Sequence, residues 1–222
     1  MSKVCIVTGA SRGLGRGIAK VLAEERSATV YATARSEAAL NDLASSIKGN
    51  TGVIHPVVLD QSDDSAVEKF ITTVAEKEGR IDLLVNSAYG GFTPMTPHFG
   101  KPFWERPISV FDASIDIGLR SAFVSSAIVA PHMVSQKSGL IVQVSSFGGH
   151  SYLFDVGYGV GKAGLDRLSA DMATELNEHG VKSLTLYPGG AVTEIARFPG
   201  GETPTFTGRS VAALLYDTPE DD

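Results

Sequence analysis

The first twenty-two residues constrain the fold more than any other stretch. Residues 4–7 are wholly apolar, residues 8–15 form a turn with three glycines, and apolar side chains then recur at helical spacing up to Leu22. A short apolar run is typical of a strand buried on both faces of a parallel sheet. The N-terminus of the following helix offers unpaired N–H groups and a positive dipole end to a phosphate. Glycine turns also occur without a ligand, but at the first strand of a βαβ unit this pattern favours dinucleotide binding.

The same alternation of strand and helix continues along the chain. Further strands are predicted at 29–33, 57–60, 81–85, 140–144 and 181–186, and helices at 37–48, 64–78, 109–135, 158–178 and 208–216. Pro56 should mark the entry to the third strand, because proline cannot donate in a central ladder, and Pro131 should kink or end the long helix. The pattern predicts an α/β fold: a Rossmann-like, doubly wound parallel sheet with helices on both faces. Without an internal repeat or linker, residues 1–222 are expected to form a single dinucleotide-binding and catalytic domain.

Charge and cysteine content narrow the class of protein. The 222 residues carry a net charge of −6 with both signs interspersed, which argues against nucleic acid or an anionic membrane as the main partner. The single cysteine, Cys5, lies in the apolar run and is expected to be a small buried hydrophobe. No signal-like segment precedes the first strand, and no apolar run reaches about 18 residues. We therefore expect no transmembrane segment and a cytoplasmic protein, with association at a membrane surface left open.

The end of the second strand bears on the choice of cofactor. NAD-binding units usually place an acidic residue there to hydrogen-bond the ribose 2′-hydroxyl, but here Ala34 and Arg35 precede the first acidic residue, Glu37. Arg12, inside the glycine turn, can reach the same region, and two guanidinium groups suit a 2′-phosphate. The alternative is that both arginines are simply solvated. The pattern favours NADP, with NAD as the less favoured cofactor.

Tyr158 and Lys162 are four residues apart at the start of a predicted helix. One turn of about 3.6 residues places both on the same face. A lysine ammonium beside a phenol favours the phenolate, so we expect Lys162 to lower the pKa of Tyr158 and make it a usable proton donor or acceptor. The spacing alone is weak evidence, since a tyrosine at a helix start with a solvated lysine one turn later gives the same pattern.

Six features follow one another at the carboxyl ends of the predicted strands. In order they are the glycine turn, Asp60, the triplet 86–88, Ser145 with Ser146, the Tyr158/Lys162 pair, and Pro188-Gly189 with Thr193. Together they resemble the short-chain dehydrogenase/reductase family over nearly the whole chain. An aromatic loop containing residues 103–105, and residues 117–120 after it, look like the subgroup called dehydrogenase/reductase family member 1.

The resemblance implies catalytic roles. Tyr158 would be the general acid in carbonyl reduction, or the base in the reverse direction, and Lys162 would lower its pKa and bind the nicotinamide ribose. A serine would hydrogen-bond the substrate oxygen. The spacing to Tyr158 favours Ser145, whereas the position that closes the fifth strand, with Gly149 three residues later, favours Ser146. We choose Ser146, and the other serine would satisfy backbone groups at the strand end.

The resemblance also implies a cofactor site and no metal site. Asp60 would bind the adenine amino group, although a helix-capping role is the alternative; Asn86 and Ala88 would line the adenosine side; and Pro188, Gly189 and Thr193 would hold the nicotinamide amide. The expected cofactor-binding residues are Gly9, Ser11, Arg12, Gly13, Leu14, Gly15, Arg35, Asp60, Asn86, Ala88, Tyr158, Lys162, Pro188, Gly189 and Thr193.

Three features depart from the family pattern. Tyr89 stands where a glycine is usual and is expected to narrow or reshape the cleft. Gly118 stands where the family has an asparagine that holds a water in the proton relay. Residues 194–207 are a short remnant of the usual substrate lid, and the family's C-terminal strand is expected to be missing from these 222 residues.

The sequence thus predicts an NADP(H)-dependent oxidoreductase of the carbonyl reductase type, which interconverts a ketone or aldehyde and an alcohol. The aromatic loop, residues 92–107, either walls a pocket for apolar carbonyls such as steroids or xenobiotics, or packs as a surface loop. The alternatives are an NAD-dependent alcohol dehydrogenase and a catalytically impaired nucleotide-binding regulatory protein, which Gly118 and the short lid would explain. A homodimer or homotetramer is plausible by family analogy.

Overall fold

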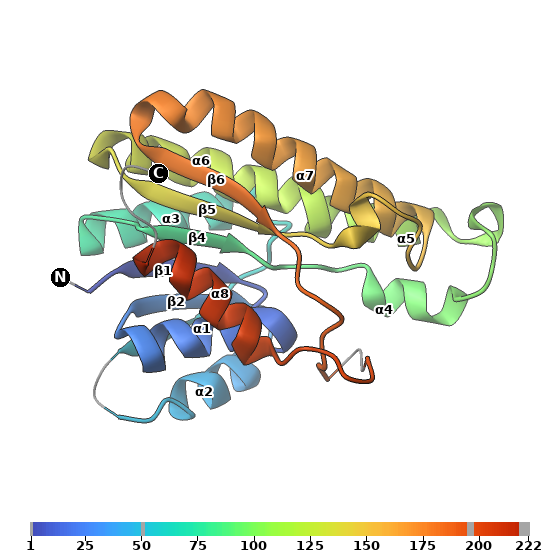
Figure 1. Ribbon diagram of the computed structural model, residues 1–222, viewed down its shortest axis with the longest axis horizontal. Coiled ribbons are helices and arrows are strands. Elements are labelled where there is room, and N and C mark those ends of the chain that lie inside the picture. The colour runs from blue at the N-terminus through green and yellow to red at the C-terminus, as the bar shows by residue number, and fades with distance from the viewer. Residues whose placement is uncertain (1, 50–51, 195–197, 218–222) are drawn as a thin grey trace.

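The computed structural model describes residues 2–49, 52–194 and 198–217. These residues form one six-stranded parallel sheet with the order β3-β2-β1-β4-β5-β6 (Figure 1). The strands are β1 Val4–Thr8, β2 Thr29–Ala34, β3 Val53–Val58, β4 Leu83–Asn86, β5 Gly139–Val144 and β6 Val181–Leu186. The order reverses between β1 and β4, and at such a switch point the carboxyl strand ends leave a crevice for a ligand. The predicted Rossmann-like architecture is confirmed.

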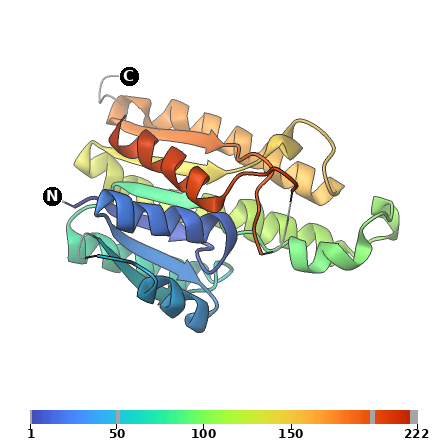
Figure 2. The same ribbon diagram turned by 60° about the horizontal axis from the view of Figure 1, so that its bottom comes forward.

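Helices cover both faces of this sheet. They are α1 Gly13–Arg26, α2 Glu37–Ser45, α3 Asp64–Glu78, the short α4 Phe92–Met95, α5 Ile108–Ile115, α6 Ser121–Gln136, α7 Val156–Leu176 and α8 Pro204–Tyr216. Helices α1, α2 and α8 lie on one face, and α3, α6 and α7 on the other (Figures 1 and 2). Helix α8 begins four residues earlier than predicted and packs along α1, which places it over the sheet.

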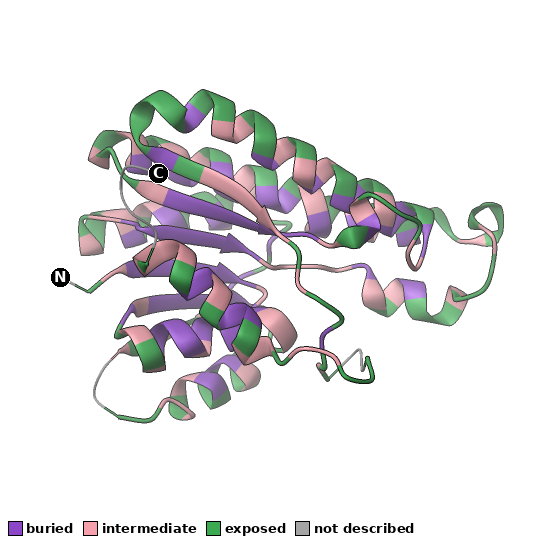
Figure 3. Cartoon of the chain, viewed as in Figure 1, coloured by how far each residue is buried: buried purple, intermediate pink, exposed green. Residues whose placement is uncertain are grey.

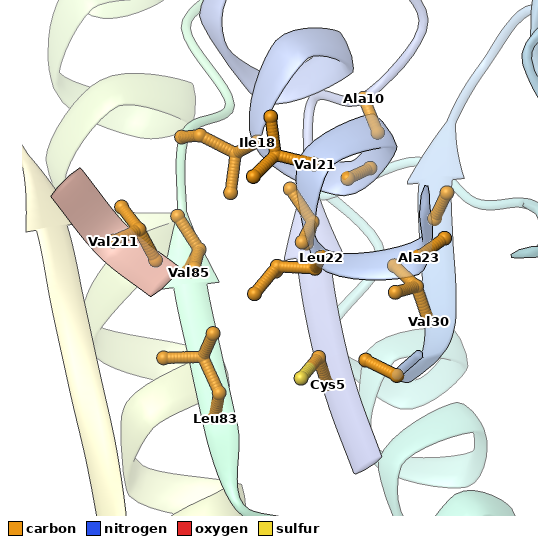
Figure 4. Close-up of a cluster of buried hydrophobic side chains, with 14 of the residues drawn as sticks. Cys5, Ala10, Ile18, Val21, Leu22, Ala23, Val30, Leu83, Val85 and Val211 are labelled. Atoms are coloured by element: carbon orange, nitrogen blue, oxygen red, sulfur yellow. The ribbon is translucent and has the colours of Figure 1, made fainter. Parts of the chain in front are cut away.

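The central strand β1 is buried on both sides. Cys5 and Val7 belong to the apolar cluster beneath α1 and α8 (Figure 4), whereas Val4 and Ile6 belong to the cluster beneath α3 and α6. Buried residues run along the central strands, whereas exposed ones lie on the outer faces of the helices (Figure 3). As predicted, Cys5 is a buried hydrophobe, and burial raises the pKa of its thiol.

The third strand differs from its predicted bounds, 57–60. It begins at Val53, and Pro56 lies inside it, opposite Ala32 of β2. Strand β3 is at the edge of the sheet, and the N–H groups of Val53 and Leu59 donate toward β2, to the carbonyls of Ala28 and Ala34. Position 56 is an odd number of residues from both, so its nitrogen faces the open edge, where no donor is needed. The prediction that Pro56 marks the entry to this strand is wrong, because proline is excluded from central strands but tolerated in an edge strand.

The long helix predicted at 109–135 is interrupted, and not at its proline. A π-helical turn, Asp116–Arg120, separates α5 from α6, and α6 continues through Pro131 to Gln136. By length and composition alone the run Ile108–Gln136 could span a membrane. Here it packs against β4, β5 and α3 as a helix of the domain. Interruptions of this π type occur frequently at functional sites, and this one carries Gly118.

Candidate active site

A pocket of about 810 Å³ opens at the carboxyl ends of the central strands. Its volume lies within the range of small-molecule and cofactor sites. The predicted site residues that line it are Gly9, Ser11, Arg12, Gly13, Leu14, Gly15, Arg35, Asp60, Ala88, Ser145, Ser146, Tyr158, Lys162, Pro188, Gly189 and Thr193. In the part of the chain that the structure describes, no cluster of His, Cys, Asp or Glu side chains could hold a metal ion.

The glycine turn is held against the end of β4. Gly9 has φ +67°, and a Cβ placed there would lie 2.8 Å from the Cα of Ala88, so no side chain fits. The hydroxyl of Thr8 accepts hydrogen bonds from the N–H groups of Ser87 and Ala88, at 3.1 Å each. The backbone of two strand ends is thereby fixed at contact distance.

In the structure, a side-chain carboxylate accepts a hydrogen bond from the glycine turn. The N–H of Gly13, at the start of α1, donates to Oε2 of Glu194 at 2.9 Å. Glu194 reaches it from the segment after β6. A carboxylate thus stands in for the negatively charged group that a helix N-terminus binds.

Arg12, Arg35 and Asp60 all line the pocket. The Asp60 carboxylate accepts from the N–H and hydroxyl of Ser62, at 2.9 and 2.8 Å, and these bonds lower its pKa, with a further contribution from Arg35. The cap of α3 is Asp63 and not Asp60. The capping alternative for Asp60 is therefore wrong.

Asn86 is the predicted site residue that does not line the pocket. Its amide is buried and donates to Oγ of Ser126 at 3.1 Å and to the carbonyl of Ala122 at 3.4 Å, both on α6. Alternation along β4 turns this side chain toward α6, away from the crevice. The expectation that Asn86 lines the adenosine side is corrected accordingly.

Tyr158 and Ser146 meet at the floor of the pocket. The Tyr158 hydroxyl donates to Oγ of Ser146 at 2.9 Å, and the N–H of Gly148 donates to the same oxygen at 3.0 Å. Ser145 is turned away, since its hydroxyl donates to the carbonyl of Lys162 at 3.2 Å. Of the two serines, Ser146 is the one beside the phenol.

Lys162 is buried one helical turn after Tyr158. Its Nζ donates to the carbonyl of Val144 at 2.7 Å, and burial lowers its pKa to about 8, although Asp166 acts in the opposite direction. Burial likewise raises the pKa of Tyr158, and the bond to Ser146 opposes this only in part. The expected lowering of the Tyr158 pKa by Lys162 is wrong for this structure. The ammonium lies 5.7 Å from the centroid of the ring, and it donates to the carbonyl of Val144.

Two charged residues that were not predicted hold the start of α7. Asp155 is the N-cap, and its Oδ1 accepts from the N–H of Tyr158 at 2.7 Å. Its Oδ2 accepts from Arg106 at 2.8 Å, and both side chains are buried. An aspartate three residues before the tyrosine is an N-cap signal that the sequence did contain. No pattern in the local sequence marks Arg106, in the aromatic loop, as the partner of Asp155.

Aromatic rings surround the ring of Tyr158. Tyr89, Phe92 and Phe154 lie with their ring centroids 5.6, 6.0 and 5.0 Å from that of Tyr158. All three line the pocket. The sequence left two alternatives for the aromatic loop, a pocket wall or a surface loop, and both apply to part of it. Phe92 lines the pocket, whereas Trp104 is 72% exposed and packs edge-on against Phe103.

The segment after β6 closes the other side of the pocket. Pro188, Gly189 and Thr193 line it, and the N–H of Gly189 donates to Oε2 of Glu202 at 3.1 Å. Ala191 and Glu202 form an isolated parallel bridge. The predicted lid remnant, residues 194–207, includes three residues (195–197) outside the described ranges.

Known proteins are similar to this chain in sequence and in fold. A family model described as short chain dehydrogenase matches residues 3–199. The mouse protein named dehydrogenase/reductase SDR family member 1 is 41% identical over 97% of this chain and 75% of its own length, and its human counterpart is 40% identical over the same shares. A 7alpha-hydroxysteroid dehydrogenase of Clostridium sardiniense is 32% identical over 84% of this chain and 70% of its own.

Solved structures agree. A metagenomic short-chain oxidoreductase, crystallised in complex with NADP, superimposes with a TM-score of 0.85 at 30% identity, over 99% of this chain and 92% of that one. The range that the family model matches, residues 3–199, contains the glycine turn, Ser146, Tyr158 and Lys162. The chain therefore belongs to the short-chain dehydrogenase/reductase family of oxidoreductases and resembles family member 1.

Proposed function

We propose that this protein is an NADP(H)-dependent oxidoreductase that reduces apolar ketones or aldehydes to alcohols. The observation that carries the proposal is the buried Tyr158 hydroxyl, 2.9 Å from Ser146 Oγ at the floor of a large pocket, with the Lys162 ammonium one turn behind it. Nicotinamide cofactors supply a hydride, so the protein has to bind the carbonyl and supply a proton.

Tyr158 is the candidate proton donor for carbonyl reduction. A phenol is protonated at neutral pH with an ordinary or a raised pKa, so the Tyr158 hydroxyl has a proton to donate to a carbonyl oxygen. Ser146 would donate its own hydroxyl proton to the same oxygen and stabilise the charge that develops there. The Gly148 N–H, which already donates to the serine oxygen, fixes the position of that hydroxyl.

The pocket offers suitable partners for NADP. The Gly13 N–H that binds the Glu194 carboxylate would bind a cofactor phosphate instead, since both are anions at a helix N-terminus. Arg12 and Arg35 line the adenosine end, where they would pair with a 2′-phosphate. Lys162 would bind the ribose hydroxyls of the nicotinamide half through the ammonium protons not directed at Val144.

The substrate side is predominantly apolar. Apart from Tyr89, its walls carry the side chains of Phe92, Ile117, Leu153, Phe154 and Phe198. Such walls bind hydrophobic ring systems and give little to a polyhydroxylated sugar. The similarity to a hydroxysteroid dehydrogenase points to the same class of substrate.

The test is a panel of carbonyls assayed with NADPH and NADH, with Tyr158→Phe beside the wild type. We expect turnover of cyclic and aromatic ketones with NADPH, and a loss of kcat of about 10²- to 10⁴-fold in the variant with cofactor binding retained. Turnover of small polar sugars alone would contradict the substrate class. Tight NADPH binding without reduction of any carbonyl would instead favour a nucleotide-binding regulatory protein.

A further inference from the structure

The ring of Tyr89 lies between Lys162 and the π-helical turn Asp116–Arg120. The Lys162 Nζ sits 5.2 Å from the centroid of this ring, over its face, and the ring meets that of Tyr158 edge-on. A cation at this distance from an aromatic face is attracted by the ring quadrupole. Tyr89 therefore contacts both members of the pair that the proposed reaction uses.

Glycine at position 118 is what leaves room for this ring. Gly118 is buried in the π-helical turn, and a Cβ there would lie 3.0 and 3.1 Å from Cδ2 and Cε2 of Tyr89. Ordinary contacts of a Cβ begin near 3.4 Å. An asparagine, the residue the family pattern has at this position, would project its side chain into space that the Tyr89 ring fills.

The ring cannot easily move aside. Its hydroxyl is 3.0 Å from Oγ of Ser114, its ring packs edge-on against Phe92 at 5.0 Å, and the backbone of Gly91 lies against the hydroxyl end. The ring is thus held on several sides. A larger residue at 118 would have to break one of these contacts.

Among the described residues, the charged group that acts on the lysine is Asp166, one turn later on α7, whose Oδ2 accepts from the hydroxyl of Tyr187 at 2.5 Å. Asp155 acts on Tyr89, and the two phenols beside the lysine, Tyr89 and Tyr158, both have raised pKa values. Asp166 favours the charged lysine, so what opposes that charge is burial. The Tyr89 ring is part of the cover that produces this burial.

We propose that Tyr89 is a positioning residue for Lys162, and that Gly118 gives the Tyr89 ring the room it occupies. The ring covers the Lys162 ammonium on the side of the π-helical turn and keeps water from that ammonium. The Tyr89/Gly118 pair thus replaces a polar side chain beside the lysine by an aromatic cover. The inference rests on the proposed function only in assigning Lys162 to the reaction.

A double-mutant cycle tests the steric half without any substrate. We expect Gly118→Ala to lower the urea midpoint of the wild type and of Tyr89→Phe, which keeps the ring. In Tyr89→Gly we expect the same substitution to leave the midpoint unchanged or raise it, because alanine is the better helix former. An equal effect of Gly118→Ala in all three backgrounds would overturn the steric pairing.

A direct titration tests the positioning half. In protein labelled with ¹³C at the lysine Cε, the Lys162 signal is assigned by its loss in Lys162→Met and followed with pH. We expect an apparent pKa near 8 in the wild type and in Tyr89→Phe, and an increase of about one pH unit or more in Tyr89→Gly, where water reaches the ammonium. The same titration in all three proteins would overturn the proposal.

Neither measurement needs turnover, so the two proposals fail separately. A wild type that reduces no carbonyl, but shows the expected cycle and titration, contradicts the function and leaves the Tyr89 role standing. A wild type that reduces ketones, while Tyr89→Gly leaves the lysine titration unchanged, contradicts the Tyr89 role alone.

Discussion

The two ends of the pocket are built in different ways. The proposed cofactor cradle, which comprises residues 8–15 with the ends of β2 and β4, is made largely of backbone: N–H groups, a glycine at positive φ and a threonine hydroxyl that joins two strand ends. The catalytic corner, comprising Tyr158, Lys162, Ser146, Tyr89 and Asp155, is made of side chains that several elements hold together. Changes in the cradle should act through local geometry, and changes in the corner through burial and charge.

The largest expected effect on stability concerns the buried ion pair between Asp155 of the corner and Arg106. Arg106→Ala leaves the carboxylate of Asp155 buried without its ionic partner, and breaking such a pair costs about 3–5 kcal/mol. Urea unfolding measures the loss. As a matched control, Arg167→Ala removes an exposed pair with Asp171 and should cost less than about 1 kcal/mol. Equal costs for the two variants would show that the corner does not depend on its buried charges.

The buried lysine should give the corner a distinctive pH dependence. The folded-state pKa of Lys162 is about 8 against an ordinary value of 10.5, so between these values the unfolded chain binds the extra proton. Stability contributed by this residue must therefore rise with pH across that window, by up to about 3 kcal/mol. The measurement is the free energy of unfolding of wild type minus that of Lys162→Met, from pH 7 to 10.5. A difference that stays flat or falls would contradict the burial of a charged lysine.

In the cradle, the expected effects are smaller and local. Gly9→Ala introduces both a left-handed residue and a Cβ 2.8 Å from the Ala88 backbone, and should destabilise by about 1–3 kcal/mol. Gly79 has a similar φ of +71° but open space around it, so Gly79→Ala reports the strain alone. We expect the Gly9 variant to lose more stability and to bind NADPH more weakly. If the two variants match, close approach of the strand ends is not what the glycine provides.

The smallest expected effect concerns cofactor choice. Arg35→Ala removes one of two guanidinium groups at the adenosine end and should weaken NADPH binding about tenfold, or about 1.4 kcal/mol, while NADH binding is unchanged. Fluorescence titration with NADPH and with NADH measures both affinities. The difference in NADPH affinity between the wild type and Arg35→Ala should shrink as salt is added. Tighter binding of NADH than of NADPH by the wild type would refute the argument from the arginines.

The sequence by itself determined the order of strands and helices, the glycine turn and the Tyr158/Lys162 pair. These depend on contacts between residues close in the chain, or on period-two and helical patterns that burial imposes. It misplaced β3, because whether a proline is tolerated depends on whether its strand lies at the edge, and that is a property of the whole sheet.

Only the tertiary structure decided how the corner is assembled. Arg106 meets Asp155 across 49 residues, and Tyr89 lies against Gly118 and Lys162 from different elements. It also reversed the expected effect on the pKa of Tyr158, since burial raises that pKa while the Lys162 ammonium donates to the Val144 carbonyl. Spacing in sequence places two side chains on one face of a helix. How far each is desolvated, and what lies beside it, depends on residues that only folding brings together.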